Sequence, residues 1–227
     1  MNGPQNPAID ARISGALKTI RWYGHDAFRV DGKTATVYFD PWQLPAGAPK
    51  GDIILVSHDH HDHCSPEDIR AVSTETTVVV TVAAAASGIT GTVKTVKPGD
   101  TLTVHGVRIS VVAAYNVNKF RSPGNPFHPK QSGHAGFIVE VDGVRIYHTG
   151  DSDFTPEMAA VKTDIALLPV SGTYVMTVEE AAKAADAMKP AAIVPMHVGR
   201  GIGSMDDREK LKKLTVVPVV ILPMEIR

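Results

Sequence analysis

Imidazole and carboxylate groups crowd one short stretch of this 227-residue sequence. The chain has ten histidines, and four of them fall within residues 58–63, which read His-Asp-His-His-Asp-His. Neutral imidazole nitrogens and carboxylate oxygens are good ligands for zinc and similar ions. In an extended stretch, His58 and His60 share one face and can turn toward a single ion, whereas Asp62 and His63 lie on the following turn and can serve a second. The stretch therefore predicts a metal site, and its spacing leaves open whether one or two ions bind.

Rigid elements on both sides are expected to position this cluster. The apolar run 53–56 precedes it and reads as a buried strand. Ser65 follows it as a helix N-cap, with Pro66 at the first helical position and acidic residues in the first turn. The histidines thus lie on a strand-to-helix loop, where the packing of apolar side chains does not explain them.

Short strands dominate the rest of the chain. The pair Asp142-Gly143 between two β-branched runs predicts a hairpin turn. Further helices are expected to begin at Thr155, Thr177 and Ser204. The length of the chain is common for a single domain, and we expect one over residues 1–227. Because strands outnumber helices, we expect the α/β (α+β) class, with a two-sheet core and helices packed outside. The predicted strands are 34–39, 53–57, 77–82, 107–113, 137–141, 144–148, 165–169, 192–196 and 216–222.

Composition excludes several classes of partner. A formal net charge of -1 provides no bulk positive field for nucleic acid or an anionic membrane. The longest apolar run, 78–86, is far shorter than the ~20 residues of a membrane helix. The single cysteine, Cys64, excludes a disulfide framework and a cysteine-rich zinc module. Residues 1–10 are polar and interrupted by proline, unlike a signal peptide. We therefore expect a cytoplasmic protein.

One long segment, 116–133, has no clear secondary structure. A loop of this length within a compact domain is usually functional or disordered. It contains the only local group of basic residues, Lys119, Arg121 and Lys130. We expect this group to bind an anionic substrate such as a sugar phosphate.

The sequence resembles the metallo-β-lactamase superfamily of hydrolases, in the branch that contains the ascorbate-6-phosphate lactonases. The resemblance covers roughly residues 20 to 200, and its motifs occur in the family's order. They are WYGHDAF at 22–28, YFDP at 38–41, HDHHDH at 58–63, IYHTGD at 146–151 and PMH at 195–197. The resemblance implies a four-layer αββα sandwich with the site at one edge, between the sheets.

The resemblance also implies a role for individual side chains. Asp151 would bridge two metal ions, Asp40 would orient a ligand histidine, and His25 would lie in the pocket. The other implied ligands are His58 and His60 for the first ion, and Asp62, His63 and His197 for the second.

The chain departs from the family pattern at the third ligand of the first metal. Many relatives have a histidine close to the position of Asn116, and the nearest histidines here are His128 and His134. The stretch FHPK at 127–130 resembles a pattern of the same branch. We therefore expect His128 to be the replacement ligand or a substrate-facing residue, ahead of His134, and Asn116 stays open as a third candidate.

These residues together predict a metal-dependent hydrolase. A metal-activated water would attack a lactone, an ester or a phosphodiester of a small metabolite, with Asp62 and Asp151 as catalytic residues. The expected cofactor is one or two divalent ions, zinc first, with manganese, iron or nickel open. The expected partner is a small molecule rather than nucleic acid or membrane, and a homo-oligomer stays open. The alternatives are an RNA or nucleotide phosphodiesterase, disfavoured by the net charge, and a non-catalytic metal-binding or metabolite-sensing module.

Overall fold

Two six-stranded sheets form the core of the computed structural model, which describes residues 9–226; most of the polar stretch 1–10 lies outside this range. The first sheet has the order β1-β2-β3-β4-β5-β6, and the second β14-β13-β12-β11-β8-β7. The strands of the first sheet are β1 (Ile20–Gly24), β2 (Ala27–Asp31), β3 (Thr36–Phe39), β4 (Ile53–Val56), β5 (Val78–Val82) and β6 (Thr92–Val96). Those of the second are β7 (Thr101–Val104), β8 (Val107–Ala113), β11 (Ala135–Val141), β12 (Val144–His148), β13 (Ile165–Pro169) and β14 (Ala192–Met196).

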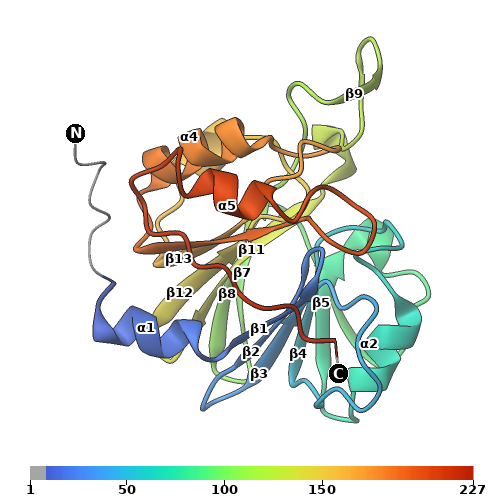
Figure 1. The fold of residues 1–227 in the computed structure, drawn as a ribbon. Coiled ribbons are helices and arrows are strands. Elements are labelled where there is room, and N and C mark those ends of the chain that lie inside the picture. Colours follow the sequence, from blue (N-terminus) through green and yellow to red (C-terminus); the bar gives the residue numbers. More distant parts are fainter. Residues whose placement is uncertain (1–8, 227) are drawn as a thin grey trace.

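Helices cover the outer faces of both sheets. Figure 1 shows α2 (Pro66–Val72) against the first sheet, and α4 (Val178–Met188) and α5 (Asp207–Leu211) against the second. The remaining helices are α1 (Ala11–Leu17) and the short α3 (Pro156–Ala159). Because each sheet is covered on both faces, a central strand such as β4 is buried along its whole length. This arrangement confirms the expected two-sheet α/β fold.

Most of the expected turns and helix starts follow the local chemistry; the exception is the last helix, α5, which begins at Asp207 with Asp206 as its N-cap rather than at Ser204. Asp142-Gly143 joins β11 and β12 as a hairpin. The side chains of Ser65, Thr155 and Thr177 each accept a hydrogen bond from the backbone N–H three residues later, at the starts of α2, α3 and α4. These caps fix where each helix enters the fold.

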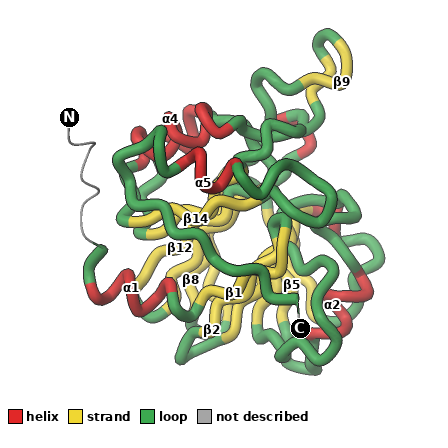
Figure 2. The backbone as a smooth tube through the Cα atoms, viewed as in Figure 1, coloured by secondary structure: helices red, strands yellow, loops and turns green. Residues whose placement is uncertain are grey.

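Two sequence-based expectations need correction. The strand predicted at 216–222 is wrong, because this segment contains Pro218 and forms only an isolated bridge, Ile193 with Val219, beside β14. The segment 116–133 is not without structure: it contains β9 (Phe120–Ser122), β10 (Asn125–Pro126) and a 3-10 turn, Lys130–Ser132. Figures 1 and 2 show that β9 and β10 project from the body of the molecule.

The strand directions bring the chemically active segments to one edge. β3, β4 and β5 run parallel in the first sheet, as do β12, β13 and β14 in the second. The carboxyl ends of parallel strands meet at the same edge of a sheet, where ligands generally bind in α/β folds. In this chain the loop 58–63, Asp151 and His197 follow such ends, whereas His25 and His128 come from connections between antiparallel strands.

Candidate metal centre

Four strand ends deliver the metal-site residues. Asp40 follows β3, the loop 58–63 follows β4, Asp151 follows β12 and His197 follows β14. Residues from sequence positions more than 150 apart therefore share one edge of the sandwich.

Left-handed backbone turns aim several of these side chains. His25, Asp40 and His197 have φ values of 52°, 41° and 58°. Non-glycine residues rarely adopt this conformation, and such strain clusters at functional sites. Gly150, at φ 59°, precedes Asp151, and a Cβ there would lie 2.8 Å from the carbonyl oxygen of Ala135. Only glycine lets the loop carrying Asp151 approach this closely.

The first ligand group contains His58, His60, His128 and Asp151, whose donor atoms lie within 4.8 Å of one another. The Nε2 atom of His58 is 3.1 Å from Nδ1 of His60. The Nε2 atom of His128 is 3.3 Å from Oδ2 of Asp151. These four side chains come from three separate loops, and their donor atoms point at a common centre.

Asp151 also faces a second group. Its Oδ1 atom lies 3.4 Å from Nε2 of His63 and 3.3 Å from Nε2 of His197. Asp62 lies beside this group, with Oδ2 3.2 Å from Nε2 of His25. Asp151 therefore lies between two sets of imidazoles, in the position expected of a bridging carboxylate.

The far nitrogens of the histidines are held by hydrogen bonds. Nδ1 of His63 donates to Oδ2 of Asp40 over 2.8 Å, since a carboxylate can only accept. Nδ1 of His58 contacts Oγ of Ser57 at 2.8 Å, and this hydroxyl donates to Asp40 over 2.6 Å. Nδ1 of His197 lies 2.9 Å from Oγ of Ser171. Hydrogen bonds of this kind fix the tautomer, so that Nε2 presents its lone pair to the centre.

Asn116 holds His128 rather than replacing it. Its Oδ1 accepts from Nδ1 of His128 over 2.9 Å and from the His128 backbone N–H over 2.8 Å. Its Nδ2 donates to the carbonyl oxygen of Tyr174, which settles the orientation of the amide. The Nε2 atom of His134 instead lies 3.6 Å from Oδ1 of Asp59. Of the three candidates for the third ligand, the geometry favours His128.

A buried carboxyl group, Asp26, lies behind the second group. It forms a further set of nearby donor atoms with His25, His63 and His197. Its Oδ2, however, is 3.9 Å from Nδ1 of His63, the nitrogen that already donates to Asp40. A cation bound at that nitrogen would displace this hydrogen bond.

The centre lies on the floor of an open cavity of about 440 Å³. Asp59, His60, His61, Asp62, Arg121, Phe127, His128, Asp151 and Tyr174 line it. Lys119 and Lys130 do not, because Lys119 pairs with Glu180 at 2.7 Å and Lys130 with Glu157 at 2.6 Å. The basic group seen in the sequence is thus reduced to Arg121 at the cavity.

Comparison with known proteins identifies the family. Residues 19–197 match the model of the beta-lactamase superfamily domain. The chain is 35% identical to a UPF0173 metal-dependent hydrolase of Thermoplasma acidophilum, over 91% of this chain and 95% of that protein. The chain belongs to the metallo-β-lactamase superfamily and is one of its metal-dependent hydrolases.

Solved structures share the architecture of this metallo-β-lactamase superfamily hydrolase. A proposed metal-dependent hydrolase from Parabacteroides distasonis has a TM-score of 0.78 and 32% identity, covering 91% of this chain and 93% of that one. A proposed zinc-dependent hydrolase of the same superfamily from Thermotoga maritima has a TM-score of 0.60 and 23% identity, covering 89% and 97%. The second likeness concerns the fold alone. No helix within residues 9–226 is both long and apolar enough to cross a membrane.

Burial and neighbouring charges tune the ligands of this superfamily member. Burial lowers the pKa of His128 to about 4 and that of His58 well below its usual range, so both are neutral at pH 7. Burial also opposes protonation of His63, but the charge of Asp151 and the hydrogen bond and charge of Asp40 raise its pKa to about 10. Burial opposes ionisation of Asp151, yet the charges of His197 and His63 hold its pKa well below the usual value.

Sequence reasoning missed several residues of the site. Ser57 directly precedes the cluster and Asp26 directly follows His25, so proximity was the available signal for both. Nothing in the sequence marks Ser171 or Tyr174, because each reaches the site only through the course of the loop after β13.

Proposed function

We propose that this protein hydrolyses a small metabolite ester, lactone or phosphodiester with a water activated at a centre of divalent metal ions. One observation carries the proposal. The Nε2 atoms of His63, His128 and His197 all lie within 3.4 Å of the Asp151 carboxylate, at the floor of an open cavity. A substrate in this cavity would meet the ligand side chains directly.

The donor set fits a cation. Nε2 of His63, Nε2 of His128 and Oδ1 of Asp151 are buried and form no hydrogen bond within the described residues. Buried polar atoms normally have partners, and bound ions would complete these. His58, His60, His128 and Asp151 would hold one ion, and Asp62, His63, His197 and Asp151 a second. When bound, such ions supply Lewis acidity toward the substrate and lower the pKa of a water ligand.

Zinc is the first candidate for both sites, because imidazole and carboxylate ligands suit it; manganese, iron and nickel are the others.

The carboxylate of Asp62 would act as the proton acceptor. Asp62 lines the cavity, and burial opposes its ionisation, but contact with His25 and the charge of His63 hold its pKa well below the usual value. A carboxylate at that place can accept a proton from the attacking water at its free oxygen. Asp151 lies between the two imidazole groups and would fix their separation.

A small-molecule substrate fits the cavity better than a polynucleotide does. With a net charge of -1 and a single cavity cation, Arg121, the chain offers little to bind a phosphate backbone. We further propose a cytoplasmic location, on the grounds that the one cysteine is a half-buried free thiol.

Metal analysis followed by a substrate panel tests the proposal. The purified full chain is loaded with zinc or manganese and assayed on lactones, phosphodiesters, thioesters and a short RNA, with His63→Ala as the inactive control. We expect turnover of a small-molecule ester, lactone or phosphodiester that the variant lacks. Cleavage of RNA alone would support the nuclease alternative instead. Bound metal without turnover above the variant would support a sensing module.

A further inference from the structure

The cavity has a second wall that none of the metal ligands forms. Phe127 and Tyr174 line it, with ring centroids 4.5 Å apart, and the guanidinium of Arg121 lies over the Phe127 ring at 5.0 Å. We call these three residues the aromatic wall. It lines the same cavity as His60 and Asp62.

The backbone holds Tyr174 in a strained conformation. Its φ is 66°, in the left-handed region that a bulky aromatic residue rarely adopts. The carbonyl of Tyr174 accepts a hydrogen bond from Nδ2 of Asn116 over 2.8 Å. Strain of this kind persists only where the surroundings enforce it, and it concentrates at ligand clamps. These contacts fix the backbone of Tyr174 at the cavity, and its side chain, 45% exposed, contacts the Phe127 ring there.

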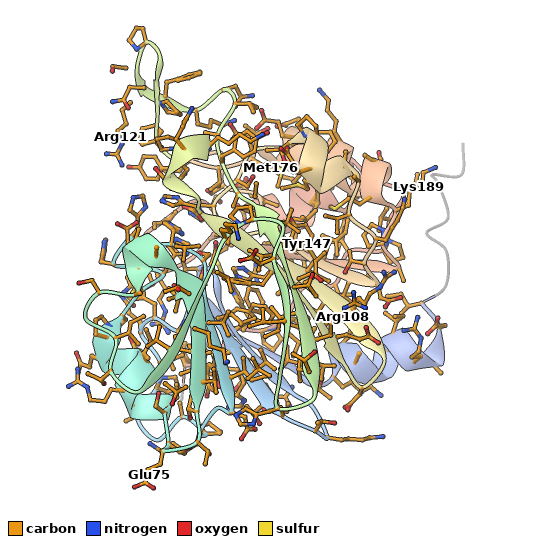
Figure 3. The ribbon with its side chains drawn as sticks, turned by 180° about the vertical axis from the view of Figure 1, so that it is seen from behind. Glu75, Arg108, Arg121, Tyr147, Met176 and Lys189 are labelled. Carbon is orange, nitrogen blue, oxygen red and sulfur yellow. The ribbon has the colours of Figure 1, made fainter. Side chains whose placement is uncertain are left out.

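Arg121 is the charged residue of the aromatic wall. Within the described residues it forms no ion pair, whereas the neighbouring Lys119 contacts both Glu180 and Asp153. Figure 3 shows Arg121 on the projecting segment that carries β9. A guanidinium stacked on an aromatic ring keeps its donors available for a carboxylate or phosphate.

The aromatic wall is connected to the first ligand group through Asn116 and His128. Phe127 directly precedes the ligand His128, and Tyr174 is hydrogen-bonded to Asn116, which holds His128. Arg121 contacts this arrangement through the ring of Phe127. A ligand that contacts all three residues would stack an apolar body on the rings and present an anionic group to Arg121.

We propose that the cavity selects small organic anions with a flat, apolar body, which stacks on Phe127 and Tyr174 while a carboxylate or phosphate meets Arg121. This inference rests on the proposed hydrolase function, because it specifies the substrate of the same site. Both parts of the ligand are required: the rings of the wall contribute by stacking, and Arg121 by charge-assisted hydrogen bonds.

Calorimetric titration of the metal-loaded full chain tests the inference without turnover. The probes are benzoate, phenyl phosphate, benzamide, acetate and methyl phosphate. We expect the two ring-bearing anions to bind about tenfold more tightly than neutral benzamide and than the matching ring-free anions. Tighter binding of benzoate points to a carboxylate substrate, and tighter binding of phenyl phosphate to a phosphorylated one; either supports the inference.

Matched variants assign each preference to its residue. Arg121→Gln should remove the preference for benzoate over benzamide, and Phe127→Leu the preference for benzoate over acetate. Arg108→Gln is the control, because Arg108 is an exposed arginine on β8, away from the cavity. Metal content is measured in every variant, so that loss of an ion is not mistaken for loss of the wall. Tyr174→Leu provides a second test of the rings if Phe127→Leu does not fold.

Equal binding of benzoate and benzamide to the wild type would overturn the inference. So would an Arg121→Gln protein that behaves like Arg108→Gln. Turnover is scored separately: the binding pattern without hydrolysis of any substrate would refute the proposed function and leave the ligand class standing. Hydrolysis without the binding pattern would support the proposed function and refute the ligand class.

Discussion

Asn116 offers a direct test of how the first ligand group is built. The side chain is buried, accepts twice from His128 and donates once to Tyr174. Replacing Asn116 by alanine removes all three hydrogen bonds while leaving every expected metal ligand in place. His128 would then lose the partner that turns Nε2 toward Asp151.

The size of the effect follows from the role of such partners. Removing a group that orients a ligand histidine typically lowers metal affinity about 10- to 100-fold. This range corresponds to about 1.4–2.7 kcal/mol of binding free energy. We expect Asn116→Ala to fall within it, because two of the three lost hydrogen bonds act on His128.

Competition titration with a zinc chelator, together with the number of ions bound per chain, measures the change. Asn118→Ala is the matched control, because it deletes the same amide from an exposed side chain two residues away. His128→Ala sets the upper limit. Wild-type affinity in Asn116→Ala would refute the positioning role of Asn116. Undiminished affinity in His128→Ala would refute the ligand role of His128 and return it to His134 or Asn116.

Three further outcomes are expected. Asp40→Ala should destabilise the protein by about 3 kcal/mol in denaturant unfolding, because it leaves buried donors of Ser57 and His63 without an acceptor; a loss below about 1 kcal/mol would contradict this. The free energy of unfolding should be about 2.7 kcal/mol lower after a chelator removes the metal than with metal held at 100 times its Kd. The His63→Ala variant should lose less stability on the same treatment. Equal thermal midpoints with and without metal would count against a bound ion. Hydrogen bonds from Lys130 and Tyr115 lower the pKa of Glu157 from 4.5 to about 2. The wild type should therefore be more stable than Glu157→Gln above pH 4.5, and this difference should disappear as the pH falls toward 2. A difference in unfolding free energy that does not change with pH would disprove this prediction.

Local sequence signals predicted much of the fold and part of the site. Eight of the nine predicted strands form, and the caps at Ser65, Thr155 and Thr177 begin helices as expected. The ninth fails because Pro218 interrupts a β-branched run: the residue types favour a strand, but proline has no backbone N–H to donate. Helix α1 and strands β1, β2, β6 and β7 are not among the predicted elements.

The sequence alone determined the chemistry of this protein. The imidazoles and carboxylates of 58–63, together with Asp151 and His197 in order, indicate a metal-dependent hydrolase, because ligand type and local spacing are written in the chain. Only the tertiary structure shows that the His128 imidazole faces Asp151 while Asn116 hydrogen-bonds to it, and that Arg121 is the basic residue that reaches the cavity. These positions depend on how a long loop returns to the strand ends. Its path is set by contacts distant in sequence, such as that of Asn116 with Tyr174, which no local pattern records.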